Sequence, residues 1–106
     1  GSYADGNVYG ILADYGSTVT GNTAYYNGYS ATGNVYGISA GTGSTVTGNT
    51  AYYNGSYAAG NVYGIYLAGY NLVDQNTAYS NGTGALSATN MNLGVTGCNY
   101  VENVAP

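Results

Sequence analysis

The chain of 106 residues contains no lysine, arginine, histidine, tryptophan or phenylalanine. Nucleic acids and anionic membranes are bound through cationic side chains that neutralise phosphate groups. The composition therefore excludes nucleic acid and a membrane surface as partners, and no apolar run is long enough to cross a bilayer. Cysteine occurs once, as Cys98, so no disulfide can form within the chain.

Acidic residues are also scarce, and they set a net charge of −4. Glycoside hydrolysis needs two carboxylates that face each other, and a metal site needs clustered ligands. The acids occupy unrelated positions: Asp5, Asp14, Asp74 and Glu102. We therefore expect no catalytic residues, no metal and no cofactor, and we predict that the chain is not an enzyme.

What the sequence does contain is a repeat of 27 residues. The string GNTAYYNG stands at 21–28 and again at 48–55, and QNTAYSNG follows at 75–82. The units 1–27 and 28–54 agree at 21 of 27 positions, 55–81 is more divergent, and 82–106 is shorter. A fixed period of this size is typical of a solenoid or an array, so we predict a single domain over 1–106.

The residue types within the repeat favour strands over helices. Each unit is rich in valine, threonine and tyrosine and is interrupted by glycine and asparagine, without a 3.6-residue apolar stripe. Three short strands in 27 residues suit one coil of a β-solenoid, whereas a propeller blade needs about 40 residues. We predict an all-β, right-handed parallel β-helix of about four coils: 1–27, 28–54, 55–81 and 82–106.

Stacked coils place equivalent residues directly above one another, about 4.8 Å apart. Asparagine amides in such columns can hydrogen-bond to their copies, and asparagine also tolerates the left-handed backbone of a sharp bend. We predict three structural Asn ladders, one at each bend: Asn7, Asn34 and Asn61; Asn22, Asn49 and Asn76; Asn27, Asn54 and Asn81.

The predicted core is thin and aliphatic. The strand around Gly10 can face either way, so the sequence leaves open whether the Val8 position or the Tyr9 position points inward. The remaining expected core columns are Val19, Val46 and Val73, then Ala24, Ala51 and Ala78, and Ile11, Ile38 and Ile65.

The segments VTGNTAYYNG and GNVYGI resemble the repeat of secreted right-handed parallel β-helix proteins of the pectate-lyase-like superfamily, and the closing GALSATNMNLGVTGCNYVENVAP resembles their terminal segment. The resemblance implies the fold and an extracellular or cell-surface location. It says little about activity, because this fold carries many functions. The lyases of the superfamily use a basic residue as proton acceptor and acid clusters for calcium, and this chain has no basic residue.

Two surface features are candidates for contact with partners. Tyr25, Tyr52 and Tyr79 are in register, with Tyr26 and Tyr53 beside them, although strand alternation predicts that one row of each adjacent pair points inward. Outward tyrosines suit a protein surface or sugar rings, including a polysaccharide. Sequons at Asn54 and Asn81 are candidate glycosylation sites, and both also belong to a predicted ladder.

The ends of the repeat suggest a function. An uncovered β-helix coil is an open edge, and the nearly identical coils offer each other a matching surface. Head-to-tail addition of identical units produces a filament. We predict a non-catalytic structural protein, a self-stacking extracellular filament or surface-layer subunit. The alternative is a carbohydrate-binding C-terminal fragment of a larger secreted β-helix protein, and a threonine array for binding ice, from TVT at 18–20 and 45–47, ranks third.

Overall fold

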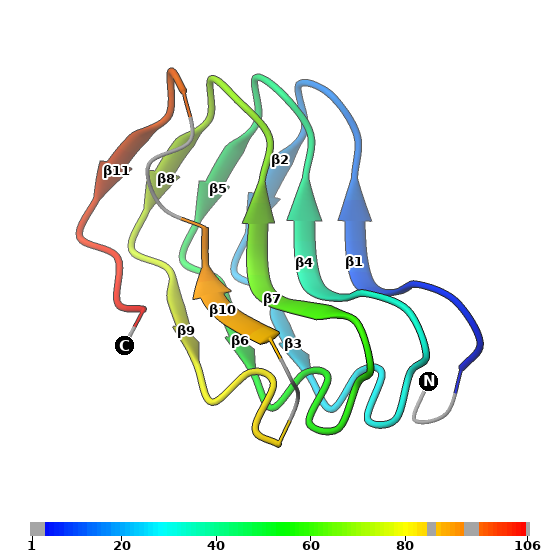
Figure 1. Ribbon diagram of the computed structural model, residues 1–106. Coiled ribbons are helices and arrows are strands. Elements are labelled where there is room, and N and C mark those ends of the chain that lie inside the picture. Colours follow the sequence, from blue (N-terminus) through cyan, green and yellow to red (C-terminus); the bar gives the residue numbers. More distant parts are fainter. Residues whose placement is uncertain (1–3, 85–86, 93–95, 106) are drawn as a thin grey trace.

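Parallel strands stacked in successive coils form the whole architecture of the computed structural model, which describes residues 4–84, 87–92 and 96–105. The described residues contain eleven strands and no helix. Figure 1 shows the chain running up one side, passing behind and returning below, which is a right-handed coil. Three complete coils and a partial fourth are present, so the predicted β-solenoid is confirmed.

Each complete coil contributes one long and two short strands. The first coil holds β1 (Val8–Ala13), β2 (Thr18–Thr20) and β3 (Thr23–Tyr25); the second holds β4 (Val35–Ala40), β5 (Thr45–Thr47) and β6 (Thr50–Tyr52); the third holds β7 (Asn61–Leu67), β8 (Leu72–Asp74) and β9 (Thr77–Tyr79); and the fourth holds β10 (Ser87–Met91) and β11 (Asn99–Val101).

The strands assemble into three parallel sheets, one for each face of the coil. Their orders are β1-β4-β7-β10, β2-β5-β8-β11 and β3-β6-β9. The register advances by 27 residues between the first three coils, as in Val19 opposite Val46. It advances by 26 residues from β7 to β10, where Ala88 lies opposite Val62. One residue is therefore missing before β10.

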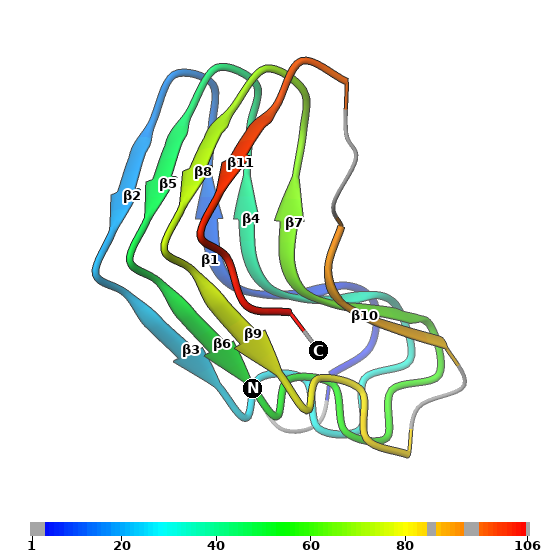
Figure 2. The same cartoon turned by 90° about the vertical axis from the view of Figure 1, so that its left-hand side faces the viewer.

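The core contains the aliphatic columns that the sequence predicts, and its central rungs Ile38, Val46 and Ala51 are fully buried. Its two clusters both lie on the inner side of the first-face strands, one before and one after the glycines Gly10, Gly37 and Gly64. The larger cluster combines the isoleucine, valine and alanine columns, and Ala105 extends the alanine column into the fourth coil. The smaller cluster lies in a side lobe, visible at the lower right of Figure 2, and consists of Val8, Ala31, Val35, Ala58 and Val62.

The side lobe resolves the orientation that the sequence leaves open near Gly10. Val8, Val35 and Val62 point inward, and the tyrosines beside them point outward as stacked rings. A Cβ at Gly10 would lie 2.5 Å from Asn27 Nδ2 and 2.6 Å from the Gly37 carbonyl oxygen. Glycine is therefore required where the strand bends, because an asparagine column passes between the two core clusters at that point.

The structure corrects the prediction that the ladder asparagines themselves adopt the left-handed backbone. In the Asn22 and Asn27 columns, the residue just before the asparagine has positive φ, such as Gly21 with φ 64° and Tyr26 with φ 55°. Gln75 and Glu102 adopt the same conformation at the positions equivalent to Gly21. Turning the chain one residue early points the asparagine side chain inward, where it reaches the coils above and below.

Candidate functional site

Two asparagine columns form continuous hydrogen-bonded ladders through the molecule. Asn49 Nδ2 donates to Asn76 Oδ1 at 2.9 Å and also back to the Val19 carbonyl oxygen at 2.7 Å. Its backbone N–H donates to the same Asn76 Oδ1 at 3.0 Å. Asn54 makes the equivalent bonds to Asn81 and to the carbonyl oxygen of Ala24. Each amide therefore joins three coils, and no buried amide hydrogen in these rungs lacks an acceptor.

Both ladders extend one rung beyond the three rungs that the sequence analysis assigned to each. Asn76 donates through its backbone N–H and Nδ2 to Asn103 Oδ1, both at 3.0 Å. Asn81 donates in the same way to Asn90 Oδ1, also at 3.0 Å. The 27-residue spacing from Asn76 could have identified Asn103. No such signal points to Asn90, which lies on β10 at the position of Gly64 and only nine residues after Asn81.

The predicted ladder of Asn7, Asn34 and Asn61 differs from the other two in chemistry and in direction. The backbone N–H of Asn34 donates to Asn7 Oδ1, and the N–H of Asn61 donates to Asn34 Oδ1, each at 2.8 Å. These bonds join a backbone donor to a side chain, without an amide-to-amide bond. Asn7 and Asn61 are exposed, so this column is the weakest of the three.

A fourth polar column, missed in the sequence, joins the first and second faces. The backbone N–H of Ser17 donates to Ser44 Oγ, that of Ser44 to Asn71 Oδ1, and that of Asn71 to Cys98 Sγ at 3.3 Å. Cys98 Sγ in turn donates to the Ala68 carbonyl oxygen at 3.2 Å. The column was hidden because three residue types fill equivalent positions, and it gives the lone cysteine a structural partner.

The polarity of these columns makes the two ends of the molecule complementary. In three of the four columns, the N–H of one coil donates to a side-chain acceptor of the next. The first coil therefore presents acceptors at Ser17, Asn22 and Asn27 to which no described residue donates. At the other end, no described residue accepts from the backbone N–H of Cys98 or Asn103.

The five tyrosines named from the sequence all point outward, on and beside the third sheet. Tyr25 is 52 % exposed and Tyr26 is 53 % exposed, so the expectation that one of each adjacent pair points inward is wrong. The reason is the left-handed conformation of Tyr26 and Tyr53, which breaks the alternation of the strand. We call this surface the tyrosine face: Tyr25, Tyr26, Tyr52, Tyr53 and Tyr79.

Ring stacking orders the tyrosine face. The Tyr25 and Tyr52 centroids lie 5.1 Å apart, those of Tyr52 and Tyr79 lie 5.2 Å apart, and both pairs are nearly parallel. Tyr26 and Tyr53 form a second row with centroids 5.6 Å apart. Desolvation and then the negative charge of the neighbouring tyrosinates raise the pKa of Tyr52 above its ordinary value of 10.0. The interior rings cover each other's faces and present edges and hydroxyl groups to solvent.

A separate row of outward tyrosines, outside the tyrosine face, lies on the first sheet. Tyr9 and Tyr36 stack at 4.8 Å, Tyr36 and Tyr63 stack at 5.5 Å, and Tyr66 meets the last two edge-on. Asn34 Nδ2 donates to the Tyr36 hydroxyl at 3.4 Å.

Neither sequon is available for glycosylation in the folded chain. Asn54 is fully buried and Asn81 is 6 % exposed. The Nδ2 atom of each donates within the ladder that begins at Asn27, which we call the third-face ladder because it follows the third-face strands. A glycan at either nitrogen would remove these hydrogen bonds and would have to pass through the core. The sequons are therefore ladder residues in the folded protein.

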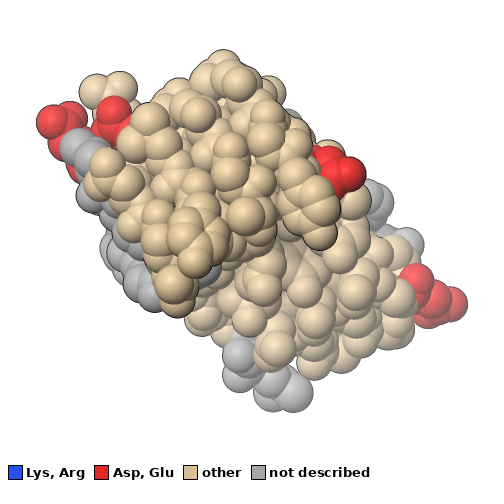
Figure 3. Space-filling model, turned by 90° about the horizontal axis from the view of Figure 1, so that it is seen from above, with Lys and Arg blue, Asp and Glu red and all other residues tan. Residues whose placement is uncertain are grey.

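Acidic groups do not assemble into a site. Figure 3 shows red carboxylates at the upper left and at the right of the visible face, with uncharged residues over the middle between these two sides. Within the described residues, no three histidine, cysteine, aspartate or glutamate side chains gather closely enough to hold a metal ion. The described part of the chain also lacks any helix with the length and apolar character needed to span a membrane.

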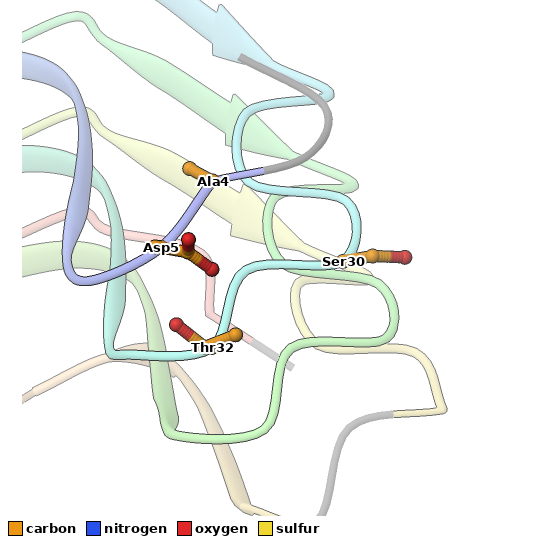
Figure 4. Close-up of a pocket in the computed structure, with 4 residues that line it drawn as sticks. All are labelled: Ala4, Asp5, Ser30 and Thr32. Atoms are coloured by element: carbon orange, nitrogen blue, oxygen red, sulfur yellow. The ribbon is translucent and has the colours of Figure 1, made fainter.

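A shallow depression near the first coil is lined by Ala4, Asp5, Ser30 and Thr32 (Figure 4). The backbone N–H of Gly6 donates to Thr32 Oγ1 at 2.9 Å, and that of Thr32 donates to the Ala4 carbonyl oxygen at 3.0 Å. Asp5 contributes the single carboxylate among these lining residues. The lining therefore lacks the second acid that a hydrolytic pair requires.

Comparison of the chain with protein-family models, with curated proteins and with solved structures found no match. The function is therefore inferred from the coil ends and the tyrosine rows.

Proposed function

We propose that this chain is a non-catalytic structural protein of the extracellular space or cell surface, a subunit that stacks head to tail on copies of itself to form a filament or surface layer. The observation that carries the proposal is the complementarity of the two ends. The first coil presents polar acceptors, and the last coil presents the N–H donors of two of the same columns, at Cys98 and Asn103. The extracellular setting and a place among pectate-lyase-like proteins rest on the resemblance of the repeat.

A second copy fits in register as a continuation of the solenoid. When its first coil takes the place of a fifth coil, Asn22 lies on Asn103 and Ser17 lies on Cys98, with β2 beside β11. The N–H and Nδ2 of Asn103 then donate to Asn22 Oδ1, as Asn76 does to Asn103 within the chain. No described acid occupies the Ser17 or Asn22 column, so these columns add no charge to the contact.

The edge of the first coil supplies the test. The N–H of Thr45 donates to the Ser17 carbonyl oxygen, and the N–H of Thr50 donates to that of Asn22. The equivalent N–H groups of Thr18 and Thr23 therefore point away from the second coil, toward an added copy. Proline at these two positions removes edge donors without removing a bond inside the chain.

The experiment is electron microscopy of the double variant Thr18→Pro, Thr23→Pro beside a Thr18→Val, Thr23→Val control, which retains both N–H groups. We expect the natural chain and the valine variant to form long unbranched fibres, and the proline variant to remain monomeric with an unchanged circular dichroism spectrum. Compact particles from all three proteins, or fibres from the proline variant, would contradict the proposal.

The tyrosine face favours a second candidate function, binding of a neutral polysaccharide. Its five phenols project outward and no charged side chain belongs to it. Phenol hydroxyls and ring edges suit sugar hydroxyl groups. Cosedimentation with insoluble neutral polysaccharides, lost when Tyr25, Tyr52 and Tyr79 are changed to alanine, would support this function. Equal binding by the alanine variant would exclude the tyrosine face as the site.

A further inference from the structure

The tyrosine face holds several phenol rings of one folded chain in contact with each other. Three pairs are stacked: Tyr25 with Tyr52, Tyr52 with Tyr79, and Tyr26 with Tyr53, with interplanar angles of 7°, 6° and 14°. The two rows also touch each other, because Tyr25 and Tyr26 have centroids 5.2 Å apart. Every ring in the face therefore has at least one phenol neighbour that the fold holds in place.

The same phenols are open to reagents in solution. Tyr25 and Tyr26 are about half exposed, and Tyr53 and Tyr79 are 38 % and 36 % exposed. None of the five hydroxyl groups is hydrogen-bonded to a described residue, so their protons can pass directly to water.

We infer that the tyrosine face is a modification site at which a peroxidase and hydrogen peroxide couple stacked tyrosines into dityrosine, joining successive coils covalently. Each of two phenols loses one electron and one proton to the oxidant, leaving two phenoxyl radicals. The radicals combine through a new bond between ortho carbons, and the hydrogens on those carbons return to the two oxygens by enolisation. One hydrogen peroxide accepts the two electrons and two protons and becomes two molecules of water.

Proximity is the physical reason for selectivity. Two radicals on neighbouring coils meet within one molecule, so their effective concentration far exceeds that of radicals on separate chains. Tyr15 offers the matched comparison, because among the described tyrosines it is the most exposed, at 79 %, and none of them is its ring partner. Exposure alone favours Tyr15, whereas stacking favours the tyrosine face and the stacked Tyr9, Tyr36 and Tyr63 of the first sheet, where only Tyr9 is exposed. The inference concerns single chains and is independent of filament formation.

The test treats dilute monomer with a haem peroxidase and limiting hydrogen peroxide. A Cys98→Ser background removes the thiol as a competing reductant, and serine already fills the equivalent positions Ser17 and Ser44. Dityrosine fluorescence gives the yield. Mass spectrometry of peptic peptides, which is required because the chain has no trypsin site, locates each link as a loss of two hydrogens.

We expect links within single chains that join residues of the tyrosine face. Two of the three stacked pairs include Tyr52, so Tyr52→Phe should lower the yield from the face to about one third, while Tyr15→Phe leaves it unchanged. Coupling mainly through Tyr15, coupling only between chains, or an unchanged yield in Tyr52→Phe would overturn the inference. Circular dichroism of both phenylalanine variants confirms that they remain folded.

Discussion

At the scale of single residues, asparagine is the structural unit of this fold. A buried amide offers two donors and one acceptor oxygen, and in the coil that combination serves the rung above, the rung below and a backbone carbonyl together. Bonds of this kind stabilise modestly in net terms, but their loss leaves several buried groups unsatisfied. The loss of stability on replacing a ladder asparagine should therefore depend on its position, and it should be larger for a buried rung than for an exposed one.

The buried rung Asn54 supplies the first prediction. Asn54→Ala leaves the two donors of Asn27 without an acceptor and removes one hydrogen bond to the Ala24 carbonyl oxygen, and we expect a loss of about 2–4 kcal/mol in the free energy of unfolding. Asn7→Ala is the control, because its rung is exposed and a loss of about 0.5–1 kcal/mol is expected. Urea titration followed by circular dichroism measures both, and similar losses in the two variants would contradict the role of burial.

Tyr52 supplies a prediction about pH. Its pKa is raised, so folding favours the neutral phenol. This contribution to stability is fully present below pH 10.0 and is lost as the pH rises through the raised pKa. Absorbance titration of tyrosinate should show a late component that disappears in Tyr52→Phe and persists in Tyr15→Phe. A late component that survives Tyr52→Phe would assign the raised pKa to another residue.

At the scale of elements, the strands of the first face are shaped by the ladder that passes beside them. Gly10, Gly37 and Gly64 leave the space in which the third-face asparagines lie, and a Cβ at Gly37 would lie 2.6 Å from Asn54 Nδ2. In β10 the equivalent residue is Asn90, and its side chain takes the place of the next rung. A strand residue thus completes a column that bend residues build in the other coils.

This substitution leads to a prediction for the last coil. Asn90→Gly restores the repeat but removes the acceptor for the N–H and Nδ2 of Asn81, so we expect a loss of about 1–3 kcal/mol and faster amide exchange in β9 and β10. Thr89→Gly is the control, since it adds the same glycine to an exposed position of the same strand. Equal exchange rates in the two variants would show that the Asn90 rung does not hold the coil.

At the scale of the whole molecule, charge opposes the assembly that the coil ends favour. Every copy carries a net charge of −4, and the chain has no cation to offset it. Long-range repulsion between copies is screened by salt, while the hydrogen bonds of the coil edges are short-range and much less affected.

Salt should therefore promote filament growth. Raising the ionic strength from about 0.01 M to about 0.15 M shortens the Debye length from about 30 Å to about 8 Å, so we expect fibres to appear at a lower protein concentration. Light scattering against protein concentration at the two salt levels measures the change. The valine variant of Thr18 and Thr23 should follow the natural chain, and a higher threshold concentration in salt would contradict end-to-end stacking.

Much of this architecture was predictable because the repeat is literal. A 27-residue period, strand-forming residues and asparagine at fixed positions indicated the parallel solenoid, its core columns and the Asn22 and Asn27 ladders. The position of Asn90 and the column that ends at Cys98 could not be predicted from the sequence. They depend on which atoms meet across coils, and different residue types fill equivalent positions there.

The sequence by itself determined the period, the strand-rich fold and the absence of cationic chemistry, since these follow from spacing and composition. Tertiary structure decided which way each side chain points. Left-handed residues before Asn22 and Asn27 turned the asparagines inward and kept both tyrosine rows outside, against simple alternation. It also decided the polarity of the columns, because the direction of a hydrogen bond between coils is set only when one coil lies on the next.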